Sequence, residues 1–136
     1  MPHPLIAALD LAPHPEGGWY RETFRQPAPD GGRGLATAIL FLLETGQQSH
    51  WHRVDATELW LWHAGSPLLL HIDRTSPLLG GDALAGQVPQ AIVPANAWQA
   101  AEAVHGWALV SCVVTPAFDF AGFELAEPGW SPPNAG

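Results

Sequence analysis

Residues 48–63 read QSHWHRVDATELWLWH, two runs of alternating side chains on either side of Asp55-Ala56-Thr57. Such alternation is typical of half-buried strands, and Asp is a frequent turn residue. The spacing predicts strands over residues 48–54 and 58–63 that pair antiparallel as a hairpin. Because side chains at positions i and i+2 of a strand point to one face, we expect His50 and His52 to face the same way. The hairpin would fold Glu58 onto that same face.

The remainder of the chain predicts further short strands. Gly and Pro number 14 each and interrupt the 136 residues at short intervals, which is typical of a protein built from many short strands. We expect these strands at residues 19–25, 35–44, 67–73, 90–93, 98–103 and 107–115. A short helix is expected at about residues 2–11, where apolar side chains form a stripe before Pro13 and Pro15.

About eight such strands in one chain of this length predict an all-β, single-domain fold. An antiparallel jelly-roll barrel over about residues 17–125 would hide the strand edges and could enclose one small ligand. The stretch after it, residues 126–136, shows no alternation and is expected to form an irregular tail.

Composition and charge exclude several classes of partner. The chain is 47% hydrophobic, carries a net charge of −8 and has only five Lys and Arg residues, so nucleic acid and anionic membranes are poor partners. No stretch approaches the roughly 18 consecutive apolar residues of a membrane span. The first residues lack the basic region and cleavage site of a signal peptide, which favours a cytoplasmic protein. The lone Cys112 lies in an apolar run and is expected to be a buried thiol.

The pair His50 and His52, with Glu58, forms the first candidate site. Two imidazoles and a carboxylate can bind a divalent transition metal such as Zn, Ni, Fe or Mn. They can also perform acid-base chemistry, because a histidine near its ordinary pKa exchanges protons at neutral pH. Either chemistry requires a small-molecule ligand beside these side chains. A bare His-x-His pair is often only a surface feature, so the residues alone leave all these interpretations open.

Aromatic and charged residues near these strands supply the other candidates. Trp60 and Trp62 share the predicted Glu58 face and could form a wall for a ligand, or simply pack. Tyr20 and Arg21 follow the Gly17-Gly18 turn: Tyr20 could donate to a ligand or pack in the core, and Arg21 could point inward toward an anion or lie exposed. Asp119 could orient a catalytic histidine or cap a turn.

Two patterns resemble the conserved motifs of the cupin superfamily. Gly46, His50, His52, Glu58 and Gly65 resemble the first cupin motif, and residues 86–99 resemble the second. Gln99 stands where metal-binding cupins place their last histidine. The resemblance therefore implies a metal set of His50, His52, Glu58 and Gln99, although an amide oxygen is a weaker ligand than imidazole.

A closer resemblance, to the cupin family DUF985 or Cupin_5, covers nearly the whole chain. It rests on the segments HPEGGWYRET at 14–23, WHR at 51–53, ELW at 58–60, VPA at 93–95, and FDF and FEL between 118 and 125. The resemblance implies a jelly-roll barrel, a homodimer and no assigned reaction.

Three functions agree with these observations. The first is a metal-free enzyme similar to the cupin-fold sugar epimerases, acting on a sugar or nucleotide-sugar, with His52 as general base and Glu58 or Asp119 orienting it. The second is a metal-dependent oxygenase or isomerase. The third is a ligand-binding or sensory protein without turnover, since a fold does not determine a function.

Overall fold

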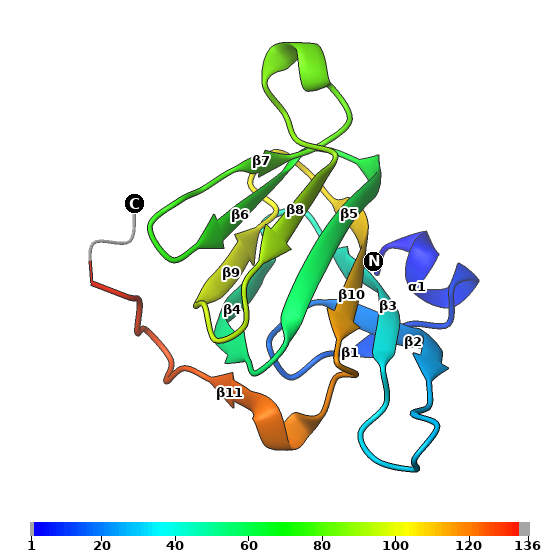
Figure 1. The fold of residues 1–136 in the computed structure, drawn as a ribbon. Coiled ribbons are helices and arrows are strands. Elements are labelled where there is room, and N and C mark those ends of the chain that lie inside the picture. The colour runs from blue at the N-terminus through cyan, green and yellow to red at the C-terminus, as the bar shows by residue number, and fades with distance from the viewer. Residues whose placement is uncertain (1, 134–136) are drawn as a thin grey trace.

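Two antiparallel sheets form the computed structural model, which describes residues 2–133 (Figure 1). The larger sheet has the strand order β1 (Ala12–Pro13), β2 (Trp19–Gln26), β3 (Ala36–Leu43), β10 (Ala108–Thr115), β5 (Thr57–Gly65) and β8 (Gln90–Val93). The smaller sheet has the order β11 (Phe123–Leu125), β4 (Gln48–Val54), β9 (Gln99–Glu102), β6 (Leu68–Ile72) and β7 (Leu78–Leu79). The helical elements are α1 (Pro4–Ala8) and the short turns η1 (Ala83–Ala85) and η2 (Phe120–Gly122). The predicted all-β, jelly-roll class is confirmed.

The core lies between the two sheets and follows directly from the alternation of the strands. In β10, which pairs with both β3 and β5, every second side chain from Ala108 to Val114 is buried. The largest fully buried side chains of the core come from both sheets and include Trp60, Phe41, Leu43, Leu68 and Leu70. Burying one such side chain stabilises the fold by about 1.5–3 kcal/mol. The face of a strand that carries these side chains therefore turns toward the core.

The predicted hairpin between residues 48–54 and 58–63 is wrong. β4 pairs with β9 and β11, whereas β5 pairs with β8 and β10, so the two strands lie in different sheets. The turn at Asp55 and Ala56 carries the chain from one sheet to the other, and the buried Ala56 packs with Val54 and Val114. This crossing places His52 and Val54 of β4 and Glu58 of β5 around one cavity, although the two strands are not hydrogen-bonded to each other.

The two ends of the chain differ from the prediction in detail. The helix is shorter than residues 2–11, because a left-handed residue, Asp10, follows its C-cap at Leu9. After β11 the tail continues along the smaller sheet, where Ala126 donates to the Trp51 carbonyl oxygen. Residues 134–136 of the predicted tail lie outside the described residues. Within residues 2–133, no helix has the length and apolar character needed to cross a membrane.

Candidate functional site

A glycine pair places Glu16 against β4. Gly17 and Gly18 have φ angles of +104° and +85°, which side chains other than glycine rarely adopt. A Cβ atom on Gly17 would collide with the Gln48 carbonyl oxygen, so the chain approaches β4 as closely as a backbone can. The Glu16 carbonyl oxygen accepts a hydrogen bond of 2.7 Å from the His50 amide. The Glu16 side chain is thereby directed into the space between the sheets.

A bulge in β4 separates His50 from His52. The register against β9 shifts between Ser49 and His52, so that three steps along β4 match two along β9. As a result Ser49 and His52 both point inward and are 1% and 2% exposed. The His50 ring is turned away, with its Nε2 atom 2.8 Å from the Glu127 carbonyl oxygen. The expectation that His50 and His52 share a face is therefore wrong, because the extra residue reverses the alternation.

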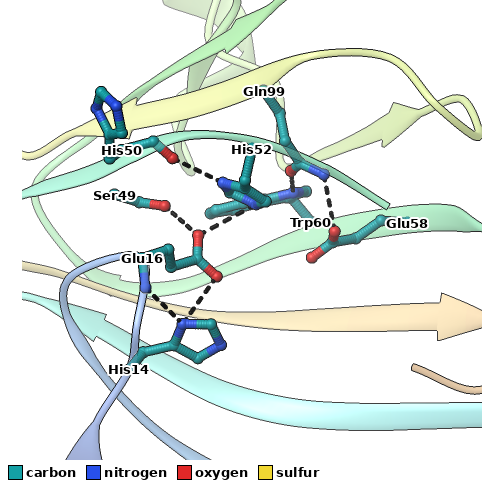
Figure 2. Close-up of polar contacts among 8 residues, drawn as sticks. All are labelled: His14, Glu16, Ser49, His50, His52, Glu58, Trp60 and Gln99. Carbon is teal, nitrogen blue, oxygen red and sulfur yellow. Dashed lines mark hydrogen bonds and ion pairs between the residues drawn. The ribbon is translucent and has the colours of Figure 1, made fainter. Parts of the chain in front are cut away.

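Glu16 joins three side chains in one polar cluster (Figure 2). Its Oε2 atom lies 3.1 Å from His52 Nε2 and accepts a hydrogen bond from the Ser49 hydroxyl group. Its Oε1 atom lies 3.2 Å from His14 Nδ1, and the same ring nitrogen accepts a 3.1 Å hydrogen bond from the Glu16 amide. The second nitrogen of His52, Nδ1, lies 2.7 Å from the His50 carbonyl oxygen. Both ring nitrogens of His52 therefore contact protein groups.

A second polar cluster, also drawn in Figure 2, connects Glu58, Gln99 and Trp60. The Gln99 amide nitrogen donates to Glu58 Oε1 at 2.9 Å, and the Trp60 indole nitrogen donates to Gln99 Oε1 at 2.9 Å. Gln99 is completely buried, and its amide group is used at both ends. Trp60 is a core residue that orients Gln99 and does not line the cavity, in contrast to the predicted ligand wall.

A small cavity reaches both clusters. It is lined by side chains from β3, β4, β5 and β10, from the β1–β2 loop and from the C-terminal segment, namely His14, Glu16, Thr37, Ile39, His52, Val54, Glu58, Cys112, Val114, Phe118 and Phe123. Its empty volume is about 360 Å³, but the centre of a water-sized sphere can move within only about 30 Å³ of it. The space admits a few waters, a ligand of a few heavy atoms, or the end of a larger one.

Burial shifts the pKa values of the cavity groups toward their uncharged forms. It raises the pKa of Glu16 to about 8, opposed by the Ser49 hydrogen bond, and the pKa of Glu58 to about 7, opposed by the His52 charge. It lowers the pKa of His14 to about 4, helped by His52, and also lowers the pKa of His52. Burial likewise raises the pKa of the Cys112 thiol, so this residue is the inert thiol that its apolar neighbours predict.

Besides His50, Trp60 and Gln99, four further predicted site residues do not line the cavity. Arg21 is exposed on β2, and Tyr20 packs its ring against His14 with centroids 4.5 Å apart. The Trp62 indole donates to the Ser66 carbonyl oxygen, and Asp119 caps η2 by accepting a 3.0 Å hydrogen bond from the Ala121 amide. The predicted role of Asp119 as a partner of His52 is wrong, because its carboxylate is exposed and engaged in that cap.

Three polar residues of the site are not indicated by any motif in the sequence: His14, Glu16 and Ser49. The first two belong to the segment that carries the family resemblance, but the resemblance implies no chemical role for them. The only local signal was the Gly17-Gly18 pair, which indicates an unusual backbone directly after Glu16. Ser49 enters the site through the bulge, which no spacing in the sequence indicates.

The predicted metal set does not fit this arrangement. His50 is turned away from the cavity, and the Gln99 oxygen accepts from Trp60. Across residues 2–133, His, Cys, Asp and Glu side chains form no group of three or more with the geometry to hold a metal ion. Only His52 and Glu58 of the four predicted ligands line the cavity.

Comparison with known proteins identifies the family. Two solved structures are similar in sequence and fold: a protein from Shewanella oneidensis (40% identity, 93% of this chain and 86% of that one, TM-score 0.83) and a hypothetical protein from Leishmania major (33% identity, 89% and 84%, TM-score 0.80). KdgF from a Halomonas species shares the fold alone (12% identity, 82% and 90%, TM-score 0.62). No curated protein matches the chain. Residues 3–126 match the Cupin superfamily (DUF985), and the chain therefore belongs to this family of cupins.

Proposed function

We propose that the protein is an enzyme of the isomerase or epimerase type, which moves a proton within a small uncharged molecule. The observation that carries the proposal is the gathering of Glu16, His52 and Glu58, all buried, around one small cavity. Buried titratable groups with pKa values shifted toward neutrality are characteristic of acid-base catalysis. Structural ion pairs are usually built from fully charged partners, whereas burial here favours the neutral forms.

The proposed step is the removal of a proton from a carbon next to a carbonyl group. His52 is the final proton acceptor at Nε2, because the His50 carbonyl oxygen holds the ring hydrogen on Nδ1. The enolate left on the ligand retains the electron pair of the broken C–H bond. Return of the proton to the same carbon on the opposite face gives an epimer, and its return to the neighbouring carbon gives an isomer. Glu58 is placed to hydrogen-bond a ligand hydroxyl group.

Size and charge narrow the ligand to a small hydroxy-carbonyl compound or the reactive end of a sugar. All five Lys and Arg residues are arginines, and none of them lines the cavity. Arg25, Arg33 and Arg53 are paired with carboxylates on the surface. A phosphate group or nucleotide inside the cavity would have no cation to offset the cost of burial. These features favour a sugar-like ligand over a nucleotide-sugar.

Deuterium exchange tests this proposal. The protein is incubated in D₂O with glycolaldehyde, dihydroxyacetone or erythrulose, and NMR follows loss of the hydrogens next to the carbonyl group. We expect exchange with the wild type and with His63→Gln, an exposed histidine, and its loss with His52→Gln. Dihydroxyacetone phosphate serves as the charged control and is expected to exchange more slowly.

Other outcomes would favour the remaining functions. Binding of these compounds without exchange would overturn the enzymatic proposal in favour of a ligand-binding or sensory protein. Elemental analysis of protein purified without an affinity tag tests the metal-dependent alternative. Near-stoichiometric metal in the wild type, lost in His52→Ala, would replace the proposed mechanism by a metal-dependent one.

A further inference from the structure

We propose that Glu16 is a further catalytic residue, which relays the proton between the ligand and His52. The relay rests on the proposed function, but the position of the proton in the resting protein does not. Three observations carry it: the contacts of the two ring nitrogens of His52, the contacts of the Glu16 carboxyl group, and the position of Glu16 in the cavity wall.

His52 has no ring nitrogen left for a ligand. Its Nδ1 atom lies 2.7 Å from the His50 carbonyl oxygen, which can only accept, so Nδ1 carries the hydrogen. Its Nε2 atom lies 3.1 Å from Glu16 Oε2. The Glu16 carboxyl group also lines the cavity, so it connects Nε2 of His52 to a ligand bound there.

The contacts of Glu16 show where one proton resides. The His14 Nδ1 lone pair already accepts from the Glu16 amide, so His14 has no hydrogen at Nδ1 to donate to Oε1. Ser49 supplies one hydrogen bond to Oε2. The contact between Oε2 and His52 Nε2 then requires a proton of its own, because two lone pairs would otherwise face each other. The low exposure of both groups, 9% for Glu16 and 2% for His52, favours a neutral carboxylic acid and a neutral imidazole.

This arrangement permits a balanced relay through the two oxygens of one carboxyl group. The proton on Glu16 Oε2 moves to His52 Nε2 while Oε1 takes the proton from the ligand carbon. The carboxyl group ends protonated on Oε1, the imidazole carries one more proton, and the ligand retains the electron pair of the broken C–H bond as its enolate. Reversal of both transfers returns a proton to the ligand and restores the neutral pair. The other titratable groups near this pair are His14, Glu58 and Cys112, which line the cavity, and His50, whose ring is turned away from it.

NMR without any ligand tests the position of the proton. With ¹⁵N-labelled histidine we expect the neutral tautomer of His52 with hydrogen on Nδ1 at neutral pH. With ¹³C-labelled glutamate we expect a protonated Glu16 carboxyl that titrates near pH 8, the value to which burial raises its pKa. This titration should disappear in Glu16→Gln, persist in Glu58→Gln, and move to higher pH in Ser49→Ala, which loses the hydrogen bond that lowers the Glu16 pKa. An imidazolium at His52, or a Glu16 carboxyl ionised at pH 6, would overturn the assignment.

Deuterium exchange then tests the relay itself. Glu16→Gln keeps the volume of the side chain but cannot take up a proton, so exchange should fall at least 100-fold although His52 is intact. Glu16→Asp keeps the carboxyl group and should recover part of the rate. Exchange in Glu16→Gln within a few-fold of the wild-type rate would refute the relay and leave the proposed function standing. Absence of exchange in the wild type would refute the proposed function, while the NMR experiment still decides where the proton lies.

Discussion

The stability of the protein should fall as the pH rises from about 6.5 to about 8. Glu16 and Glu58 have an ordinary pKa of 4.5, so in the unfolded chain they are ionised throughout this range. In the folded protein burial raises these pKa values to about 8 and about 7. The folded state therefore binds more protons than the unfolded state, and the free energy of unfolding decreases with pH. The buried histidines His14 and His52, with an ordinary pKa of 6.5, are half protonated at pH 6.5 in the unfolded chain and neutral in the fold, which offsets less than about 1 kcal/mol of this loss.

The size of this loss of stability follows from the pH range over which each carboxyl group is protonated in the fold but ionised in the unfolded chain. One pH unit of differential protonation corresponds to about 1.4 kcal/mol. Glu16 keeps its proton over about 1.5 units of the range, which gives a loss of roughly 2 kcal/mol, and Glu58 over about half a unit, which adds less than 1 kcal/mol. With the histidine offset included, the wild type should lose about 2 kcal/mol, whereas the stability of Glu16→Gln should stay nearly constant, because the contributions of Glu58 and the histidines almost cancel.

Urea denaturation at intervals between these two pH values, followed by tryptophan fluorescence, measures both curves. Glu58→Gln is the matched control, because it removes the other buried carboxyl and should retain the larger, Glu16-dependent slope. A wild-type free energy of unfolding that is constant or rises with pH would refute the reasoning. Equal slopes in the wild type and Glu16→Gln would show that the proton does not reside on Glu16.

Four further results are expected. Between pH 6.5 and 4 the unfolded chain protonates His14 while the fold keeps it neutral, so His14 by itself lowers the free energy of unfolding by up to about 3 kcal/mol. His14→Gln should therefore gain up to this amount relative to the wild type between pH 6.5 and 4, measured by urea denaturation. Gln99→Leu leaves the Trp60 indole N–H without its acceptor and should cost about 2–4 kcal/mol in urea denaturation. Gly17→Ala should lower the free energy of unfolding by several times the roughly 1 kcal/mol expected for Gly46→Ala. Both glycines have a positive φ, but only at Gly17 would the added Cβ atom collide with a backbone carbonyl oxygen. Equal losses in urea denaturation would contradict the steric argument. The homodimer implied by the family resemblance remains a prediction, and a monomeric mass in light scattering would contradict it.

Much of the fold can be predicted from local pattern. The boundaries of β4 and β8 agree with the sequence prediction, and those of β2 and β3 differ from it by at most one residue. Alternation and turn residues act over a few positions, so the printed chain already contains their effect. The family motifs lead to the same jelly-roll class, which the family match confirms. Local pattern does not predict which strands pair with each other. β4 and β5 are neighbours in the chain, yet they belong to separate sheets.

The sequence by itself determined most of the strands and turns, and the family. Only the tertiary structure decided that Glu16 meets His52, that Ser49 replaces His50 on the inner face, and that Gln99 binds Trp60 and Glu58. The physical reason is the distance along the chain over which the deciding interactions act. A strand forms from the preferences of adjacent residues, whereas the bulge in β4 and the approach of Glu16 arise when two sheets and a loop pack together. The polar contacts and the pKa shifts of the cavity exist only after that packing has removed water.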